Sequence, residues 1–172
     1  MRYLRPVEPF LALYDEGRVY EFKAQTVEEW KVWRESLKEK LIELLGGFTD
    51  RIPLEPEVLE RKEFKDYTRE RVIFNSAPKV SVVGYLLIPK ETRLPAPGVI
   101  ALHGHGYGKD DIVGIWEDGT ERSIPDGYQK DFGISLVKSG LVTFAIEQSC
   151  FGERREPEDI ERDKYQSSCR KV

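Results

Sequence analysis

The chain has 172 residues, of which 40% are hydrophobic, and its 27 basic and 31 acidic residues give a net charge of −4. This content is enough to bury one sizeable core. The longest apolar runs are far shorter than the roughly 20 residues that cross a bilayer, and the mixed charges form no basic stripe of the kind that binds nucleic acid. We therefore expect a cytoplasmic protein with neither membrane nor nucleic acid as a partner.

The first predicted element is a helix over 27–45. Thr26 and Glu29 have the spacing of a capping box, in which each side chain satisfies a free backbone N–H. Apolar residues then recur at steps of three and four, which predicts one buried stripe. The stripe consists of Trp30, Trp33, Leu37, Leu41 and Leu44. We assign residues 1–56 to an N-terminal helical segment that packs on a domain formed by residues 57–172.

A period of two follows the helix and predicts three strands over 58–64, 67–74 and 80–88. Residues 75–78, Asn-Ser-Ala-Pro, predict the turn between the last two. Charged residues on one face of the strands are typical of an antiparallel meander with one solvent-exposed face.

A strand–helix–strand unit comes next. Residues 98–102 form a continuous apolar run, which predicts a strand covered by helices on both faces. A helix is predicted over 127–138, with Asp126 as its N-cap and with Gly140 ending it. Its expected buried residues are Tyr128, Phe132 and Leu136. A second buried strand over 141–146 completes a βαβ unit.

The sequence His103-Gly104-His105-Gly106 follows the strand over 98–102. An apolar strand that ends in His-Gly and a glycine-rich turn resembles the α/β-hydrolases, in particular the dienelactone-hydrolase-like and acetyl-xylan-esterase-like members. The extended segment over 84–89 and the acidic, glycine-containing turn over 147–154 support this resemblance. It implies an α/β fold that is an incomplete α/β-hydrolase: an N-terminal helix, antiparallel strands and the first βαβ of the parallel sheet.

The resemblance also implies roles for residues of the loop. In this fold the loop donates a backbone N–H to the oxyanion hole, and by position we expect His105 to be the donor, with Gly104 and Gly106 as alternatives. The His103 ring is expected to lie under the loop as a structural group. Three aromatic residues on or near the loop are expected to bind substrate. They are Tyr107, Trp116 and Tyr128.

The chain contains no Gly-x-Ser-x-Gly pentapeptide and no histidine after His105, although serine hydrolases of this fold need both. We therefore expect the N-terminal part of a serine hydrolase that acts on small-molecule carboxylic esters or similar acyl bonds without a cofactor. This part supplies the oxyanion loop, lacks nucleophile, acid and base, and is inactive alone. The strand over 98–102 would then have an unpaired edge, which predicts self-association or a missing C-terminal half.

Three alternatives remain at this point. His103 and His105 have a spacing that can hold one metal ion, with Glu147 or Asp110 as an oxygen ligand, which would suit a metal-dependent hydrolase. Cys150 follows the second buried strand and could act as a nucleophile beside Glu147. A non-catalytic binding or scaffold module that keeps half of a hydrolase fold is the third.

Overall fold

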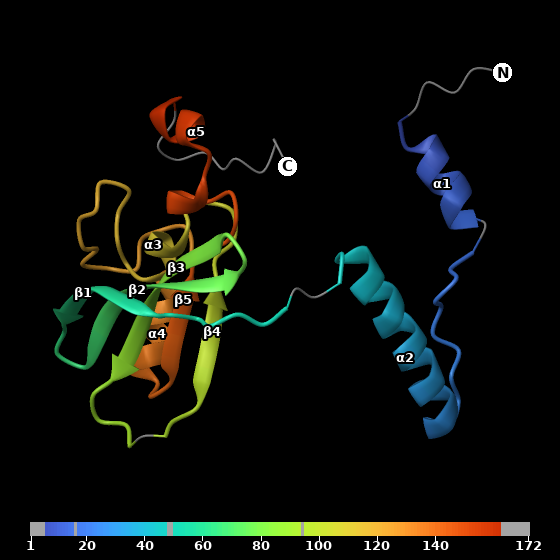
Figure 1. Cartoon of the computed structure of the whole chain (residues 1–172), viewed down its shortest axis with the longest axis horizontal. Coiled ribbons are helices and arrows are strands. Elements are labelled where there is room, and N and C mark those ends of the chain that lie inside the picture. The colour runs from blue at the N-terminus through green and yellow to red at the C-terminus, as the bar shows by residue number, and fades with distance from the viewer. Residues whose placement is uncertain (1–5, 16, 48–49, 94, 163–172) are drawn as a thin grey trace. The chain divides into compact units, whose positions relative to one another are not determined.

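The computed structural model describes residues 6–15, 17–47, 50–93 and 95–162. The chain divides into two compact units, residues 1–50 and 51–172, which are taken separately below (Figure 1). In the part of the chain that is described, no helix combines the length and the apolar character needed to span a membrane.

The first unit contains helices α1, Glu8–Asp15, and α2, Val27–Leu44. The predicted cap of α2 is confirmed, because the Thr26 hydroxyl accepts the N–H of Glu29 at 3.2 Å. The Glu29 carboxylate reaches back to the N–H of Gln25 at 2.8 Å, one residue before the usual partner. The sequence therefore places this helix correctly to within one residue at its C-terminal end.

The apolar stripe of α2 is not buried in this structure. No residue of α2 is buried, and Trp30 and Leu41 are 42% and 54% exposed. Trp33 makes contacts within the unit: its indole N–H donates to the Tyr20 carbonyl at 3.0 Å and its ring packs edge-on against Phe22. The predicted stripe is therefore not buried within the first unit, and its packing on the second unit stays a prediction.

The second unit is built on one five-stranded sheet with the order β1-β2-β3-β5-β4 (Figure 1). Its strands are β1, Glu57–Glu63; β2, Tyr67–Ala77; β3, Val80–Pro89; β4, Gly98–Leu102; and β5, Val142–Ile146. The first three form the predicted antiparallel meander. The turn after β2 is shorter than predicted, because the strand runs on to Ala77 and Lys79 adopts a positive φ of 62° to reverse the chain.

The predicted βαβ unit is confirmed. β4 and β5 pair in parallel, from Gly98 opposite Val142 to Leu102 opposite Ile146. Between them lie α3, Lys109–Ile112, and α4, Phe132–Lys138. After β5 come a 3-10 turn, η1, Gly152–Arg154, and a short helix, α5, Pro157–Arg162.

The helix before β5 begins five residues later than the sequence predicts. Lys130 and Asp131 have positive φ values of 53° and 48°, which a right-handed helix cannot contain. Asp131, not Asp126, therefore occupies the N-cap position. Tyr128 lies outside the helix and is 77% exposed, so its assignment to the buried face was wrong. Phe132 and Leu136 do pack against the core, as predicted.

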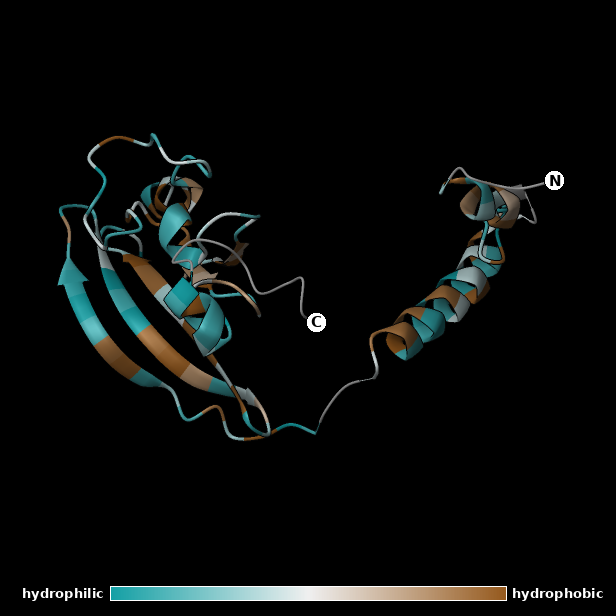
Figure 2. Cartoon of the chain, turned by 90° about the horizontal axis from the view of Figure 1, so that it is seen from above, coloured by the Kyte–Doolittle hydropathy of each residue, from teal (hydrophilic) through white to brown (hydrophobic). Residues whose placement is uncertain are grey.

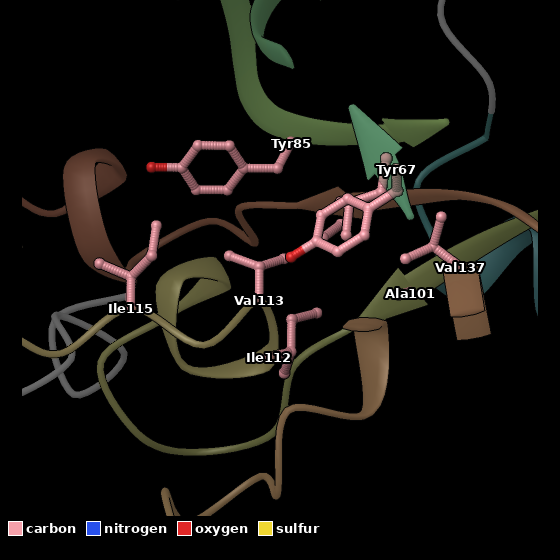
Figure 3. Close-up of a cluster of buried hydrophobic side chains, with 9 residues drawn as sticks. Tyr67, Tyr85, Ala101, Ile112, Val113, Ile115 and Val137 are labelled. Atoms are coloured by element: carbon pink, nitrogen blue, oxygen red, sulfur yellow. The ribbon is translucent and has the colours of Figure 1, made fainter. Parts of the chain in front are cut away.

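The core lies on one face of the sheet, beneath α3 and α4 (Figures 2 and 3). It contains Tyr67, Tyr85, Leu87, Ala101, Ile112, Val113, Ile115, Val137 and Ala145. On the other face, Ile100 and Leu102 of β4 are 66% and 56% exposed. The prediction that helices cover both faces of this strand is therefore wrong within the described residues, which also leave β4 at the edge of the sheet.

Candidate functional site

The loop over 103–108 connects β4 to α3 and belongs to neither a helix nor a strand. Gly106 and Gly108 have φ values of 144° and 101°, which side-chain-bearing residues rarely adopt. The glycines therefore let the chain turn sharply at the end of β4. The backbone amides of such a loop are not committed to a regular ladder, which is the condition that an oxyanion-binding loop must meet.

The His103 ring lies under this loop, as the sequence predicts. The residue is 3% exposed. Its Nδ1 is 2.8 Å from the Gly104 carbonyl oxygen. Its Nε2 is 3.1 Å from the backbone N–H of Gln148 and 3.2 Å from Glu147 Oε1. Burial disfavours the imidazolium, but the hydrogen bonds with Glu147 and Gly104 outweigh it and raise the pKa of His103 above its usual value.

His105, the predicted oxyanion donor, is exposed at the tip of the loop. Its carbonyl oxygen accepts the side-chain amide of Gln129 at 3.0 Å. Its ring packs edge-on against Phe151, with 5.4 Å between the ring centroids. Gly104, one of the two alternative donors, is also exposed, and Gly106 is half-buried. The three candidate amides thus belong to one anchored, solvent-accessible turn.

A buried ion pair supports the far end of the loop. Glu147, which follows β5, and Lys109, the first residue of α3, are both fully buried. Glu147 accepts the Lys109 backbone N–H at 3.0 Å and the Lys109 ammonium at 3.2 Å. The ammonium also contacts Glu153 at 2.6 Å and Asp110 at 3.3 Å. A buried charge needs such partners to remain ionised.

In the Glu147–Lys109 pair, each charge favours the ionised form of the other residue. Burial raises the pKa of Glu147, but hydrogen bonding from His103 and the charge of Lys109 outweigh burial and lower it overall. Burial likewise lowers the pKa of Lys109, but the surrounding carboxylates of Asp110, Glu147 and Glu153 outweigh burial and raise it. Both groups are therefore charged at neutral pH.

Two glycines make room for the Glu147 carboxylate. A Cβ atom at Gly108 or at Gly152 would overlap it, and both glycines have positive φ. The loop after β4 and the turn after β5 therefore close on the same side chain from two directions. The sequence signal for this arrangement is present but weak: an acidic residue directly after a buried strand, with a glycine in the following turn.

A second buried charge cluster surrounds Arg122. Its guanidinium pairs with Asp111 at 3.0 Å and with Asp131, and it donates to the Tyr107 hydroxyl. Its Cζ atom lies 4.2 Å from the centre of the Trp116 ring. Among the described residues, the Arg122 Nε atom is the one buried side-chain polar atom without a hydrogen-bond partner. This cluster fixes the segment between α3 and α4.

The Arg122 cluster also reaches the loop. The Asp111 carboxylate accepts the backbone N–H of Gln129 at 3.2 Å, and the Gln129 side chain donates to the His105 carbonyl. The loop is therefore anchored from both charge clusters. Sequence reasoning missed Lys109, Asp111, Arg122 and Gln129, because each finds its partner across the fold and none lies in a recognisable motif.

The three aromatic residues predicted to bind substrate are only partly brought together. Tyr107 and Trp116 both contact Arg122, whereas Tyr128 projects into solvent. Tyr107 also lines a cavity of about 360 Å³. Its other lining residues are Asp110, Glu117, Gly152, Glu153, Arg155 and Ile160. Trp116 and Tyr128 are not among them. Substrate binding stays a prediction for all three aromatic residues, of which Tyr107 alone lines this cavity.

The structure gives the metal alternative no donor cluster. Among the described residues, no three His, Cys, Asp or Glu side chains are grouped so as to hold a metal ion. Both ring nitrogens of His103 already have partners in Gly104 and in Glu147 or Gln148.

Cys150, the alternative nucleophile, is a half-buried free thiol with a φ of 68°. Cys169 lies outside the described residues.

Comparisons with known proteins identify proteins to which this chain is similar. The chain is 28% identical over 126 residues to "Putative hydrolase YtaP" of Bacillus subtilis (strain 168), covering 71% of this chain and 40% of that protein. A crystal structure described as "a putative acetyl xylan esterase" from Bacteroides fragilis matches with a TM-score of 0.73 at 21% identity, covering 95% of this chain and 42% of that one. The chain therefore spans about two fifths of the length of these relatives.

The structural match shows that the two proteins share a fold, here the first part of an α/β-hydrolase sheet. The family model described as the Abhydrolase family matches residues 11–170, which is nearly the whole chain. The chain belongs to the Abhydrolase family of α/β-hydrolases.

Proposed function

We propose that this chain supplies the oxyanion-binding part of a serine hydrolase that acts on carboxylic esters or similar acyl bonds. The observation that carries the proposal is the exposed, glycine-containing turn at Gly104–Gly106, which is anchored through Glu147 and Gln129 at the end of a parallel strand. A tetrahedral acyl intermediate develops negative charge on oxygen, and a fixed N–H directed at that oxygen stabilises it without reorganisation. His105 is the proposed donor.

The remaining catalytic groups are assigned, in this proposal, to sequence outside these 172 residues. The chain has no nucleophile-elbow pentapeptide, and its two histidines are His103 and His105. His103 is buried and hydrogen-bonded through both ring nitrogens, so it cannot approach a substrate to serve as general base. The chain's share of about two fifths of its relatives' length leaves room for a nucleophile, an acid and a base elsewhere.

The exposed edge of β4 supports a related proposal about partners. Within the described residues β4 pairs with β5 on one side only, and Ile100 and Leu102 expose apolar surface. An unpaired apolar edge recruits a further strand. We propose that the β4 edge is completed either by further sequence of the same protein or by a second copy of this chain.

The decisive experiment removes one N–H at a time from the loop. The complete reading frame that contains these residues is expressed, and hydrolysis of p-nitrophenyl acetate and of acetylated xylan is measured. His105→Pro removes the backbone donor, whereas His105→Ala removes only the ring. We expect kcat of the proline variant to fall about 10²- to 10³-fold below that of the alanine variant.

Proline substitutions at Gly104 and Gly106 test the two alternative donors in the same assay. A large loss at one of these positions and none at His105 would move the donor role to that position. Absence of hydrolysis by the unaltered gene product would refute the esterase proposal. It would favour the non-catalytic binding module, which is consistent with the absence of a nucleophile-elbow pentapeptide from these 172 residues and with the open β4 edge.

A further inference from the structure

The amide of His105 belongs to the same rigid peptide group as the carbonyl of Gly104. A peptide bond is planar and trans, so its C=O and N–H point in opposite directions within one plane. Any contact that fixes the direction of the Gly104 carbonyl therefore fixes the direction of the His105 N–H. The group that binds this carbonyl therefore determines where the proposed oxyanion donor points.

The His103 imidazole binds the Gly104 carbonyl. Nδ1 of His103 is 2.8 Å from the Gly104 oxygen, which is a hydrogen-bonding distance. A carbonyl oxygen can only accept, so Nδ1 must carry the hydrogen. The ring of residue 103 thus reaches forward along its own chain and sets the plane of the peptide that contains the proposed donor.

The other ring nitrogen of His103 contacts the two residues that follow β5. Nε2 of His103 receives the Gln148 N–H at 3.1 Å when it is unprotonated. When it is protonated, it donates to Glu147 Oε1, 3.2 Å away. Glu147 is in turn held by the Lys109 ammonium and backbone N–H. In either protonation state of the ring, Nδ1 keeps its hydrogen and its contact with Gly104.

We propose that His103 is the positioning residue of the oxyanion donor: its ring, clamped by Glu147 and Gln148, orients the Gly104–His105 peptide so that the His105 N–H points into the site. This inference rests on the proposed function of the loop and names the side chain that prepares it. His103 acts through His105 and does not itself touch substrate.

The neighbouring peptide provides an internal control, because a different side chain holds it. The Gln129 amide donates to the His105 carbonyl at 3.0 Å, and that carbonyl shares a peptide plane with the Gly106 N–H. Gln129→Ala is therefore expected to shift the Gly106 amide resonance and to leave the His105 amide resonance close to that of the unaltered chain.

The first test is NMR of the unaltered 172-residue chain. ¹⁵N–¹H spectra of the imidazoles report which ring nitrogen of His103 carries a proton. We expect a slowly exchanging Hδ1 proton on His103 at every pH at which the chain is folded. A neutral ring protonated only on Nε2 would overturn the proposal, and this measurement does not depend on any variant being able to fold.

The second test uses two variants that each keep one half of the ring's bonding. The side-chain amide nitrogen of asparagine occupies nearly the place of Nδ1, and that of glutamine the place of Nε2. His103→Asn can still donate to the Gly104 carbonyl, whereas His103→Gln cannot. In His103→Asn we expect the His105 amide resonance to stay close to that of the unaltered chain. In His103→Gln we expect the resonance to shift and the backbone ¹⁵N order parameter of His105 to fall, because the peptide has lost the hydrogen bond to its carbonyl.

Equal His105 amide resonances and order parameters in the two variants would overturn the positioning role, since a merely structural histidine would not distinguish them. In the complete gene product, His103→Gln should lower kcat for p-nitrophenyl acetate with little change in KM, and His103→Asn should recover most of that loss. If the His105 amide responds as expected but the unaltered gene product hydrolyses no ester, the positioning of the peptide stands and the proposed function fails.

Discussion

The Glu147 carboxylate accepts the backbone N–H of Lys109 at 3.0 Å and its ammonium at 3.2 Å, so a residue that follows β5 fixes the residue at which α3 begins. The same carboxylate lies 3.2 Å from the His103 ring. His103 and Lys109 are the two ends of the loop that carries the candidate amides. One buried side chain therefore contacts both residues that bound the loop.

The space around this carboxylate gives a first prediction. Gly108→Ala should lower the free energy of unfolding by about 2–4 kcal/mol. The added methyl group would overlap Glu147, and alanine would have to adopt the backbone φ of 101° that this position requires. Gly119→Ala is the matched control, since Gly119 has a similar φ of 85° but open space around it; its cost should be about 1 kcal/mol. Equal losses in urea unfolding would show that Glu147 does not fill the space beside Gly108.

Removal of the Glu147 charge is predicted to destabilise the chain in a pH-dependent way. Glu147→Gln leaves the Lys109 ammonium buried with one carboxylate fewer, which should cost about 3–5 kcal/mol at pH 7. The folded pKa of Glu147 is below the usual 4.5, so its stabilisation is complete above pH 4.5 and is lost as the pH falls through the folded pKa.

The difference in unfolding free energy between the unaltered chain and Glu147→Gln should therefore shrink on acidification below pH 4.5. Glu60→Gln, on the exposed surface of β1, serves as the control and should change stability by at most about 0.5 kcal/mol. A loss that is independent of pH down to the acid unfolding transition would contradict the charged state of Glu147.

The second charge cluster leads to a prediction about Arg122. Arg122→Met should lower the free energy of unfolding by about 3–5 kcal/mol, because Asp111 is fully buried and loses its charged partner. Arg61→Met removes an arginine that is 61% exposed and paired on the surface of β1; this control should cost at most about 1 kcal/mol. Thermal or urea unfolding of the two variants measures both, and comparable losses would refute a structural role for the buried cluster.

The open edge of β4 predicts the behaviour of the chain in solution. If β4 recruits a second copy, Ile100→Lys should reduce self-association in sedimentation velocity, because a charge on an edge strand opposes pairing. Ile100 is 66% exposed, so stability should change by only about 0.5 kcal/mol. Val58→Lys, on exposed β1 at the opposite edge, is the control. A monomer at all concentrations before substitution would exclude self-association and leave further sequence as the occupant of this edge.

The sequence predicts the regular elements of the second unit because their signals are local. Alternating residues define β2 and β3, and the continuous run over 98–102 defines β4. The start of α4 could not be predicted in this way. Asp126 and Asp131 are equally acceptable N-caps by type, and only the positive φ at Lys130 and Asp131 distinguishes them. That conformation is set by tertiary contacts, including the pairing of Asp131 with Arg122.

The sequence predicts the loop of the candidate site but not the buried ion pair that supports it. The motif His103–Gly106 is contiguous and can be read directly, and the ring of His103 is indeed beneath the loop. The sequence indicates Glu147 as an acidic residue after a strand, as a possible metal ligand and as a neighbour of Cys150, but not as a partner of Lys109, which lies 38 positions away in the sequence. The parallel pairing of β4 with β5 brings the two chain segments together.

The dependence of the His105 amide on the ring of the residue two positions earlier separates two kinds of evolutionary constraint. The donor at position 105 is main chain, so nearly any residue except proline can provide it. Position 103 must provide a side chain that reaches forward to a specific carbonyl. Natural variation in this turn should accordingly be permissive at the residue that does the chemistry and strict at the residue that never meets the substrate.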